Sequence, residues 1–178
     1  MHEDIERILF SEEEISAKTK ELGAIISADY NGKRPIIAGV LKGAFVFTAD
    51  LVRNISIPVQ MDFLIAKSYG DSAETSGSVK LIKDLENDIS GRHVILVEDI
   101  IDSGLTMKRL FEVLKKRNPA SLKLCSLLSK PDRRLTEIKI DYCGWDIPDE
   151  FVVGYGLDYA ERYRNLPYIG VLKRELYT

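Results

Sequence analysis

Histidine and cysteine are scarce in this chain of 178 residues, and their scarcity limits the chemistry that it can perform. The only histidines are His2 and His93, so we do not expect a zinc site built from clustered histidines. The two cysteines, Cys125 and Cys143, lack the C-x-x-C spacing of metal and redox motifs. So few cysteines favour a reducing, cytoplasmic location, with Cys125 as a buried thiol inside a strand-like run.

Long apolar runs and a strong net charge are also missing. The most apolar long segment, residues 36–52, is interrupted by Lys42 and Asp50, so it is unsuited to crossing a membrane. The first six residues are acidic rather than basic, and no apolar signal region accompanies them, so we expect no secretory signal. The formal net charge of −3 argues against general binding to nucleic acid or to a membrane surface.

Two common glycine-rich nucleotide motifs, G-x-x-x-x-G-K-[ST] and G-x-G-x-x-G, do not occur in the sequence. We also find no internal repeat and no linker that would divide the chain. A chain of 178 residues with 45% hydrophobic residues can bury one proper core. We therefore expect a single domain over residues 1–178.

The hydrophobic pattern predicts strands that alternate with helices. Ser11 and Glu14 form a capping box, and the helical stripe that follows stops at Asn31-Gly32. The pattern further predicts strands over residues 35–40, 59–67, 94–97, 122–129, 151–153 and 168–172, and helices over 43–53 and from about 106 to 118. This alternation implies an α/β fold with a central, mostly parallel sheet flanked by helices. The two chain ends would form a small lobe over the carboxyl edge of the sheet.

The most informative run is residues 94–106, V-I-L-V-E-D-I-I-D-S-G-L-T. It predicts a buried strand that ends in two adjacent carboxylates, Glu98 and Asp99, followed by a polar turn and the start of a helix. Backbone N–H groups at a helix start, with the Ser103 and Thr106 hydroxyls, suit a phosphate. Carboxylates at the end of a parallel strand can accept hydrogen bonds from a sugar diol or hold Mg²⁺. Together these groups predict a site for a ribose 5-phosphate.

A simpler interpretation is an acidic turn that caps a helix, with Asp102 or Ser103 as the N-cap. Capping needs one polar side chain, whereas this run has five, so we favour the phosphate site. The run closely resembles the phosphoribosyl pyrophosphate loop of the type I phosphoribosyltransferases. The resemblance implies that ribose 5-phosphate is bound by Glu98, Asp99, Ile100, Ile101, Asp102, Ser103, Gly104, Leu105 and Thr106.

A second anion site is reasonable at Leu41-Lys42-Gly43, because this tripeptide follows a buried strand and opens a helix. Otherwise it is a loop lysine beside a packing glycine. The resemblance implies that these three residues form the family's pyrophosphate loop, in which the Leu41–Lys42 peptide can be cis. Ser68 and Tyr69 precede a stretch too polar to pack, which is either an ordinary polar hairpin or, as the resemblance implies, a lid over the reaction centre.

Two later segments are candidates for binding a flat base. Lys130 follows a predicted strand and borders the predicted site, and we interpret Arg133 and Arg134 beyond it as residues of a solvated turn. Phe151 could stack on a heterocycle while the Val152 backbone hydrogen-bonds to its edge, although such residues are more often plain core.

A polar turn near the end of the chain contains Asp158 and Arg164. Arginine can hold phosphate oxygens bidentately, so Arg164 is a second candidate for binding an anion.

These segments resemble, in order and from about Leu9 to Leu172, the hypoxanthine-guanine phosphoribosyltransferases. The resemblance implies Mg²⁺-dependent transfer of a phosphoribosyl group to hypoxanthine or guanine, by a homodimer or homotetramer. It implies Asp102 as general base and Leu41, Lys42, Gly43 and Arg164 as pyrophosphate ligands. It further implies Lys130, Phe151, Val152 and Asp158 at the purine, and Glu98, Asp99 and Asp158 at the metal.

Two alternatives stay open at this point. The base could be xanthine, adenine, orotate or uracil, although a lysine cannot accept a hydrogen bond, which argues against adenine and pyrimidines. The chain could also be a regulatory protein of the same fold that binds nucleotides and RNA. That function needs a basic face, which the net charge does not supply.

Overall fold

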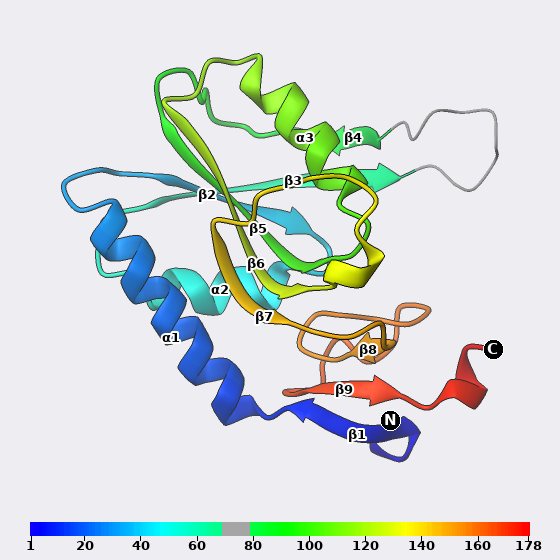
Figure 1. The fold of residues 1–178 in the computed structure, drawn as a ribbon. Coiled ribbons are helices and arrows are strands. Elements are labelled where there is room, and N and C mark those ends of the chain that lie inside the picture. Colours follow the sequence, from blue (N-terminus) through cyan, green and yellow to red (C-terminus); the bar gives the residue numbers. More distant parts are fainter. Residues whose placement is uncertain (69–78) are drawn as a thin grey trace.

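The computed structural model describes residues 1–68 and 79–178, and its architecture is α/β (Figure 1). The three helices within these residues are α1 (Glu12–Asp29), α2 (Phe45–Arg53) and α3 (Leu105–Lys115). The strands are β1 (Ile5–Phe10), β2 (Ile36–Leu41), β3 (Gln60–Ser68), β4 (Val79–Lys83), β5 (His93–Ile101), β6 (Ser121–Ser129), β7 (Tyr142–Asp146), β8 (Val152–Val153) and β9 (Ile169–Leu172). No helix in the described part of the chain has the length and apolar character to cross a membrane.

The larger sheet has the strand order β4-β3-β2-β5-β6-β7, with β4 antiparallel and the other strands parallel to one another. Alternate side chains of its central strands pack into two hydrophobic cores, one on each face of the sheet, because successive residues of a strand point to opposite faces. Ile37 and Ile95 pack with α1 and α2, whereas Ile36 and Val94 pack with α3. Figure 1 shows the resulting layers, with α1 and α2 below the sheet and α3 above it. The predicted sheet with helices on both faces is confirmed.

The start of α1 is capped as the sequence predicts. Ser11 Oγ accepts a hydrogen bond from Glu14 N at 3.2 Å, and Glu14 Oε2 accepts one from Ser11 N at 2.8 Å. The strand predicted over residues 94–97 is too short, because β5 continues through the carboxylates to Ile101. This end of β5 stays paired with β6, up to Ile101 opposite Ser129. The strand pairing therefore extends beyond the apolar residues 94–97.

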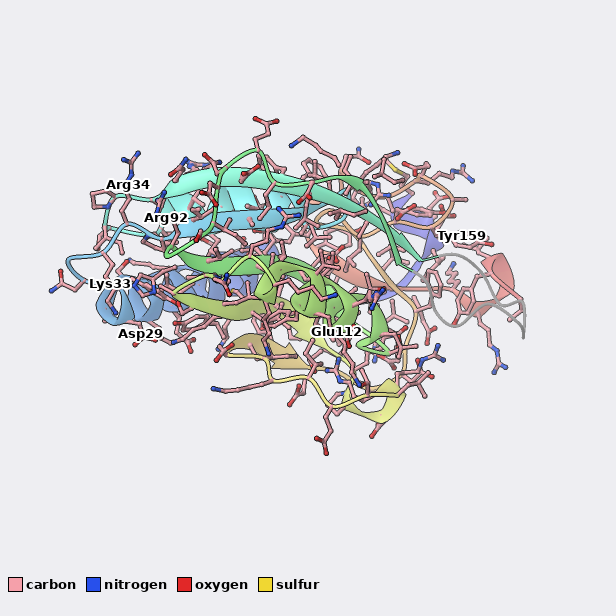
Figure 2. All side chains as sticks on the ribbon, turned by 90° about the horizontal axis from the view of Figure 1, so that it is seen from above. Asp29, Lys33, Arg34, Arg92, Glu112 and Tyr159 are labelled. Carbon is pink, nitrogen blue, oxygen red and sulfur yellow. The ribbon has the colours of Figure 1, made fainter. Side chains whose placement is uncertain are left out.

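A small antiparallel sheet of β1, β9 and β8 joins the two ends of the chain, which confirms the predicted lobe. A cluster of buried side chains including Val153, Tyr163 and Leu172 holds this lobe together. In Figure 2, Tyr159 of the lobe lies at the opposite end of the molecule from Lys33 and Arg34. The basic residues at that far end are therefore remote from the lobe.

Candidate active site

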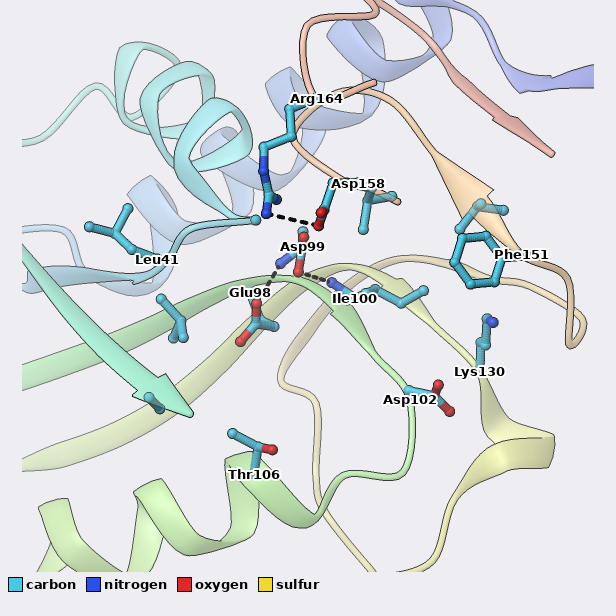
Figure 3. Close-up of a pocket in the computed structure, with 15 residues that line it drawn as sticks. Leu41, Glu98, Asp99, Ile100, Asp102, Thr106, Lys130, Phe151, Asp158 and Arg164 are labelled. Atoms are coloured by element: carbon cyan, nitrogen blue, oxygen red, sulfur yellow. Dashed lines mark hydrogen bonds and ion pairs between the residues drawn. The ribbon is translucent and has the colours of Figure 1, made fainter. Parts of the chain in front are cut away.

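A pocket of about 390 Å³ lies between the carboxyl ends of the central strands and the small lobe (Figure 3). A hollow of about 210 Å³ beside it reaches the start of α3. The predicted residues that line the pocket are Leu41, Gly43, Glu98, Asp99, Ile100, Asp102, Thr106, Lys130, Phe151, Val152, Asp158 and Arg164. Ile101, Ser103 and Gly104 line the hollow. The fold thus brings most of the predicted residues to one place.

Four predicted residues are placed in neither the pocket nor the hollow. The side chain of Lys42 is 67% exposed and pairs with Glu161 at 3.2 Å, and Leu105 is 44% exposed. Ser68 ends β3, but its side chain and the whole of Tyr69 lie outside the described residues.

The turn before α3, predicted to bind a phosphate, depends on Gly104, the N-cap of α3, which has a φ of 81°. A side chain there would be strained at that φ and would crowd Arg134 and Ile138. The turn leaves Ser103 and Thr106 beside the backbone N–H groups of the first helical turn, which have no partner inside a helix. Hydroxyl and N–H donors placed at a helix start in this way can form an anion cradle.

Glu98 and Asp99 are two carboxylates at the floor of the pocket, and Asp99 is only 8% exposed. Burial raises the pKa of Glu98 well above its usual range, and the negative charge of Asp99 raises it further. Burial also raises the pKa of Asp99. The oxygens of two carboxylates crowded in this way are the ligands that Mg²⁺ prefers. The donor set therefore fits a divalent cation.

Within residues 1–68 and 79–178, no group of three or more histidine, cysteine, aspartate or glutamate side chains is arranged to hold a metal ion. Mg²⁺ is commonly held by one or two carboxylates together with substrate phosphates and water. The pair Glu98 and Asp99 suits that mode of binding. Asp158 already accepts hydrogen bonds at both oxygens, from Arg164 Nη2 at 2.8 Å and from Glu161 N at 2.9 Å, so its part in metal binding stays a prediction.

Arg164 lies beside this acidic floor. Its Nη1 donates to the Gly156 carbonyl at 2.7 Å and its Nη2 pairs with Asp158. Its Nε is buried and has no hydrogen-bond partner among the described residues. These contacts fix the guanidinium against the pocket wall and leave further N–H donors of the group unused.

The loop after β2 confirms one feature of the resemblance, because the Leu41–Lys42 peptide is cis. Gly43 lies so close to Asp99 that an added Cβ atom would overlap the carboxylate. The loop and the carboxylate floor therefore form one packed unit at the carboxyl edge of the sheet.

The opposite end of the pocket combines a cation with an aromatic ring. Lys130 is 8% exposed, and its Nζ contacts Asp149 Oδ1 at 3.4 Å. The Phe151 ring stacks on Tyr177, with centroids 4.7 Å apart, and meets Tyr159 edge to face at 5.4 Å. Figure 3 shows Lys130, Phe151 and Asp102 around this end of the pocket. Both tyrosines support the ring from behind and were not predicted.

Arg133 is exposed in a turn, as expected, whereas Arg134 is half-buried, and both contact Asp102 of the predicted phosphate loop or its neighbours. Arg133 Nε donates to Asp102 Oδ1 at 3.0 Å, and Arg134 donates to the Asp102 carbonyl at 3.2 Å and to Ser129 Oγ at 2.9 Å. The signal that could have revealed these contacts is strand order. Because β5 and β6 are parallel neighbours, the segments that follow them meet at the same edge of the sheet.

Comparisons with known proteins show the family of this chain. The family model described as phosphoribosyl transferase domain matches residues 8–160. The hypoxanthine-guanine phosphoribosyltransferase of Bacillus subtilis (strain 168) is 54% identical over 177 residues, which cover 99% of this chain and 98% of that protein. The same enzyme of Streptococcus agalactiae serotype V is 51% identical over 178 residues, with 100% and 99% covered. A crystal structure of a hypoxanthine phosphoribosyltransferase from Staphylococcus aureus superposes with a TM-score of 0.96 at 47% identity, covering 100% of this chain and 97% of that one.

Proposed function

Because the chain belongs to the hypoxanthine-guanine phosphoribosyltransferases, a family of purine-salvage transferases, we propose that it transfers phosphoribosyl from phosphoribosyl pyrophosphate to N9 of hypoxanthine or guanine. The products are a nucleoside monophosphate and pyrophosphate. The observation that carries the proposal is one pocket with an anion cradle, a carboxylate pair, and a lysine beside an aromatic ring. These groups match the phosphate, the ribose and the base.

The phosphoribosyl half of the substrate fits the floor of the pocket. Residues 103–106 would bind the 5-phosphate through hydroxyl and backbone N–H donors. Glu98 and Asp99 would fix the ribose diol and hold Mg²⁺ together with substrate oxygens, and Asp158 would assist them. When bound, Mg²⁺ supplies positive charge that neutralises the departing pyrophosphate. Arg164 and the backbone of Leu41 to Gly43 would bind that leaving group, and Lys42 would add positive charge.

The base fits the other end of the pocket. Phe151 would stack on the purine, the Val152 backbone would bind its edge, and the Asp158 backbone would face C2. Lys130 would donate a hydrogen bond to O6. Asp102 would act as general base near N7 and manage the proton of the incoming purine. Positive charge that develops on the ribose as pyrophosphate leaves would be stabilised by the carboxylates below it.

A transferase for adenine is the second candidate, and the position of Lys130 disfavours it. Lys130 has only donors, and adenine would present another donor at that position. We also propose a homodimer or homotetramer and a cytoplasmic location, supported by the resemblance and by the small number of cysteines. Analytical ultracentrifugation and fractionation of cells test these two statements.

The experiment that tests the proposed function supplies the purified protein with hypoxanthine, phosphoribosyl pyrophosphate and Mg²⁺. We expect inosine monophosphate and pyrophosphate in equal amounts. Guanine in place of hypoxanthine should give guanosine monophosphate. A protein that is folded by circular dichroism but forms no nucleotide from either base would contradict the proposal.

A further inference from the structure

Four side chains of alternating charge connect the two functional ends of the base pocket. Lys130 Nζ contacts Asp149 Oδ1 at 3.4 Å, and Asp149 Oδ2 is 3.4 Å from Arg133 Nη1. Arg133 Nε in turn lies 3.0 Å from Asp102 Oδ1. Lys130 and Asp102 line the pocket, whereas Arg133 and Asp149 are about half exposed at its rim. The two rim residues therefore touch the pocket only through the two residues that line it.

The backbone holds these side chains in register. Lys130 N donates to the Ile101 carbonyl at 2.9 Å, and Leu135 N donates to the Ser103 carbonyl at 3.0 Å. The segment from Lys130 to Leu135 is thus attached to the phosphate-binding loop on both sides of Asp102. These backbone hydrogen bonds fix the main chain, so only the side chains of Lys130 and Asp102 can still change conformation. The ion pairs with Arg133 and Asp149 restrict these side-chain conformations.

We propose that Asp149 and Arg133 are positioning residues that orient Lys130 and Asp102 as one unit. The inference rests on the proposed function, because it assigns base recognition to Lys130 and proton transfer to Asp102. Each rim residue has two partners of opposite charge, so its removal affects both ends. Without Asp149, Lys130 and Arg133 lose the anion between them. Without Arg133, Asp102 and Asp149 lose the cation between them.

The expected effects differ between the two rim residues. A lysine that is no longer held must be ordered by the incoming base, so Asp149→Asn should raise KM for hypoxanthine by about three- to ten-fold. Without Arg133 the Asp102 carboxylate is less well aimed at its proton, so Arg133→Gln should lower kcat by about two- to five-fold, a range that suits a half-exposed ion pair. KM for phosphoribosyl pyrophosphate should stay within about two-fold of wild type in both variants, since neither residue lines the phosphate cradle.

The test is a double-mutant cycle on kcat/KM for hypoxanthine with Asp149→Asn, Arg133→Gln and the double variant. We expect the double variant to lose less than the product of the two single losses, and Arg133→Lys to recover part of kcat. Arg109→Gln is the matched control, because it breaks the 2.9 Å ion pair with Glu112 on α3, and neither of these residues lines the pocket. Its kinetics should equal those of the wild type.

Wild-type kinetics in both single variants would overturn the inference, and so would losses that multiply independently in the double variant. A parallel fall in melting temperature and in all kinetic constants would also overturn it, since it would show a merely structural role. A wild-type protein that makes no nucleotide would instead refute the proposed function. The two failures are therefore distinguishable.

Discussion

Gly43→Ala is the substitution for which the structure gives the clearest expectation. The added Cβ atom would overlap Asp99 Oδ2, and Asp99 is itself buried and hydrogen-bonded to Ile100 N at 2.8 Å. On the other side, the carbonyl of Gly43 lies against Gly156, where no Cβ could fit either. The loop is held on both sides, so the methyl group cannot be accommodated by a small rotation.

The size of the effect follows from this geometry. Either the loop or the carboxylate has to move by about 1 Å, and a misplacement of that size in an active site costs about 10²-fold in rate. Overpacking by one methyl group costs about 1–3 kcal/mol of the free energy of unfolding. We therefore expect kcat/KM to fall by about 10²-fold while the protein still folds.

Gly91→Ala is the matched control. Gly91 has a φ of 66°, and a Cβ there would have no atom within 4 Å. This variant should lose about 1–2 kcal/mol through backbone strain alone and keep its activity. Urea denaturation and steady-state kinetics of both variants separate the two effects. If Gly43→Ala kept an activity within about three-fold of wild type, the packing of the loop against Asp99 would not matter for function, and our reasoning would be refuted.

Three further predictions concern the general base, the metal and stability. Asp102→Asn keeps the shape of the side chain but removes its basicity, so kcat should fall by about 10²–10⁴-fold. Binding of phosphoribosyl pyrophosphate, measured by calorimetry, should change little. Near-normal turnover would exclude Asp102 as the general base. Activity should disappear with a chelator and return with Mg²⁺ or Mn²⁺, and full activity in metal-free buffer would contradict the metal role of Glu98 and Asp99. Burial raises the pKa of Asp62, but hydrogen bonds from Asn87, Phe63 and Glu86 lower it by more, so the net pKa is below its usual value. The ionised carboxylate therefore stabilises the fold above about pH 4, and this stabilisation is lost as the pH falls through the folded-state pKa. Asp62→Asn should therefore cost about 1–3 kcal/mol at pH 7 and less as the pH falls below about 4 in urea denaturation. A cost that does not change with pH would show that the charge is irrelevant.

The sequence was sufficient for the central strands, the helices and the turn before α3, because each is specified by local patterns. It was insufficient for β1, β4 and β7, which were not predicted. β1 pairs with β9 at the other end of the chain, so its partner cannot be seen from a local window. β4 and β7 are the edge strands of the large sheet, and their partially exposed residues lack a continuous apolar run.

The residues of the candidate site also differ in whether a local sequence pattern specifies them. Residues 98–106 could be proposed as a site because one continuous run contains the strand, the carboxylates and the turn. Arg133 and Asp149 contact the site only through parallel strands that end side by side. Tyr177 stacks on Phe151 because the chain ends meet in the small lobe. These contacts depend on tertiary structure, which local composition does not specify.

The most direct test of the account is the choice between bases, measured as kcat/KM for hypoxanthine and adenine in the wild type and in Lys130→Gln. Lys130 is nearly buried and has only donors, so the wild type should prefer hypoxanthine by about 10⁴-fold. The variant should lose most of its efficiency with hypoxanthine and guanine, keep its KM for phosphoribosyl pyrophosphate, and tolerate adenine relatively better, because glutamine also accepts hydrogen bonds. Wild-type efficiency with hypoxanthine in Lys130→Gln, or a wild type that uses adenine equally well, would contradict the account.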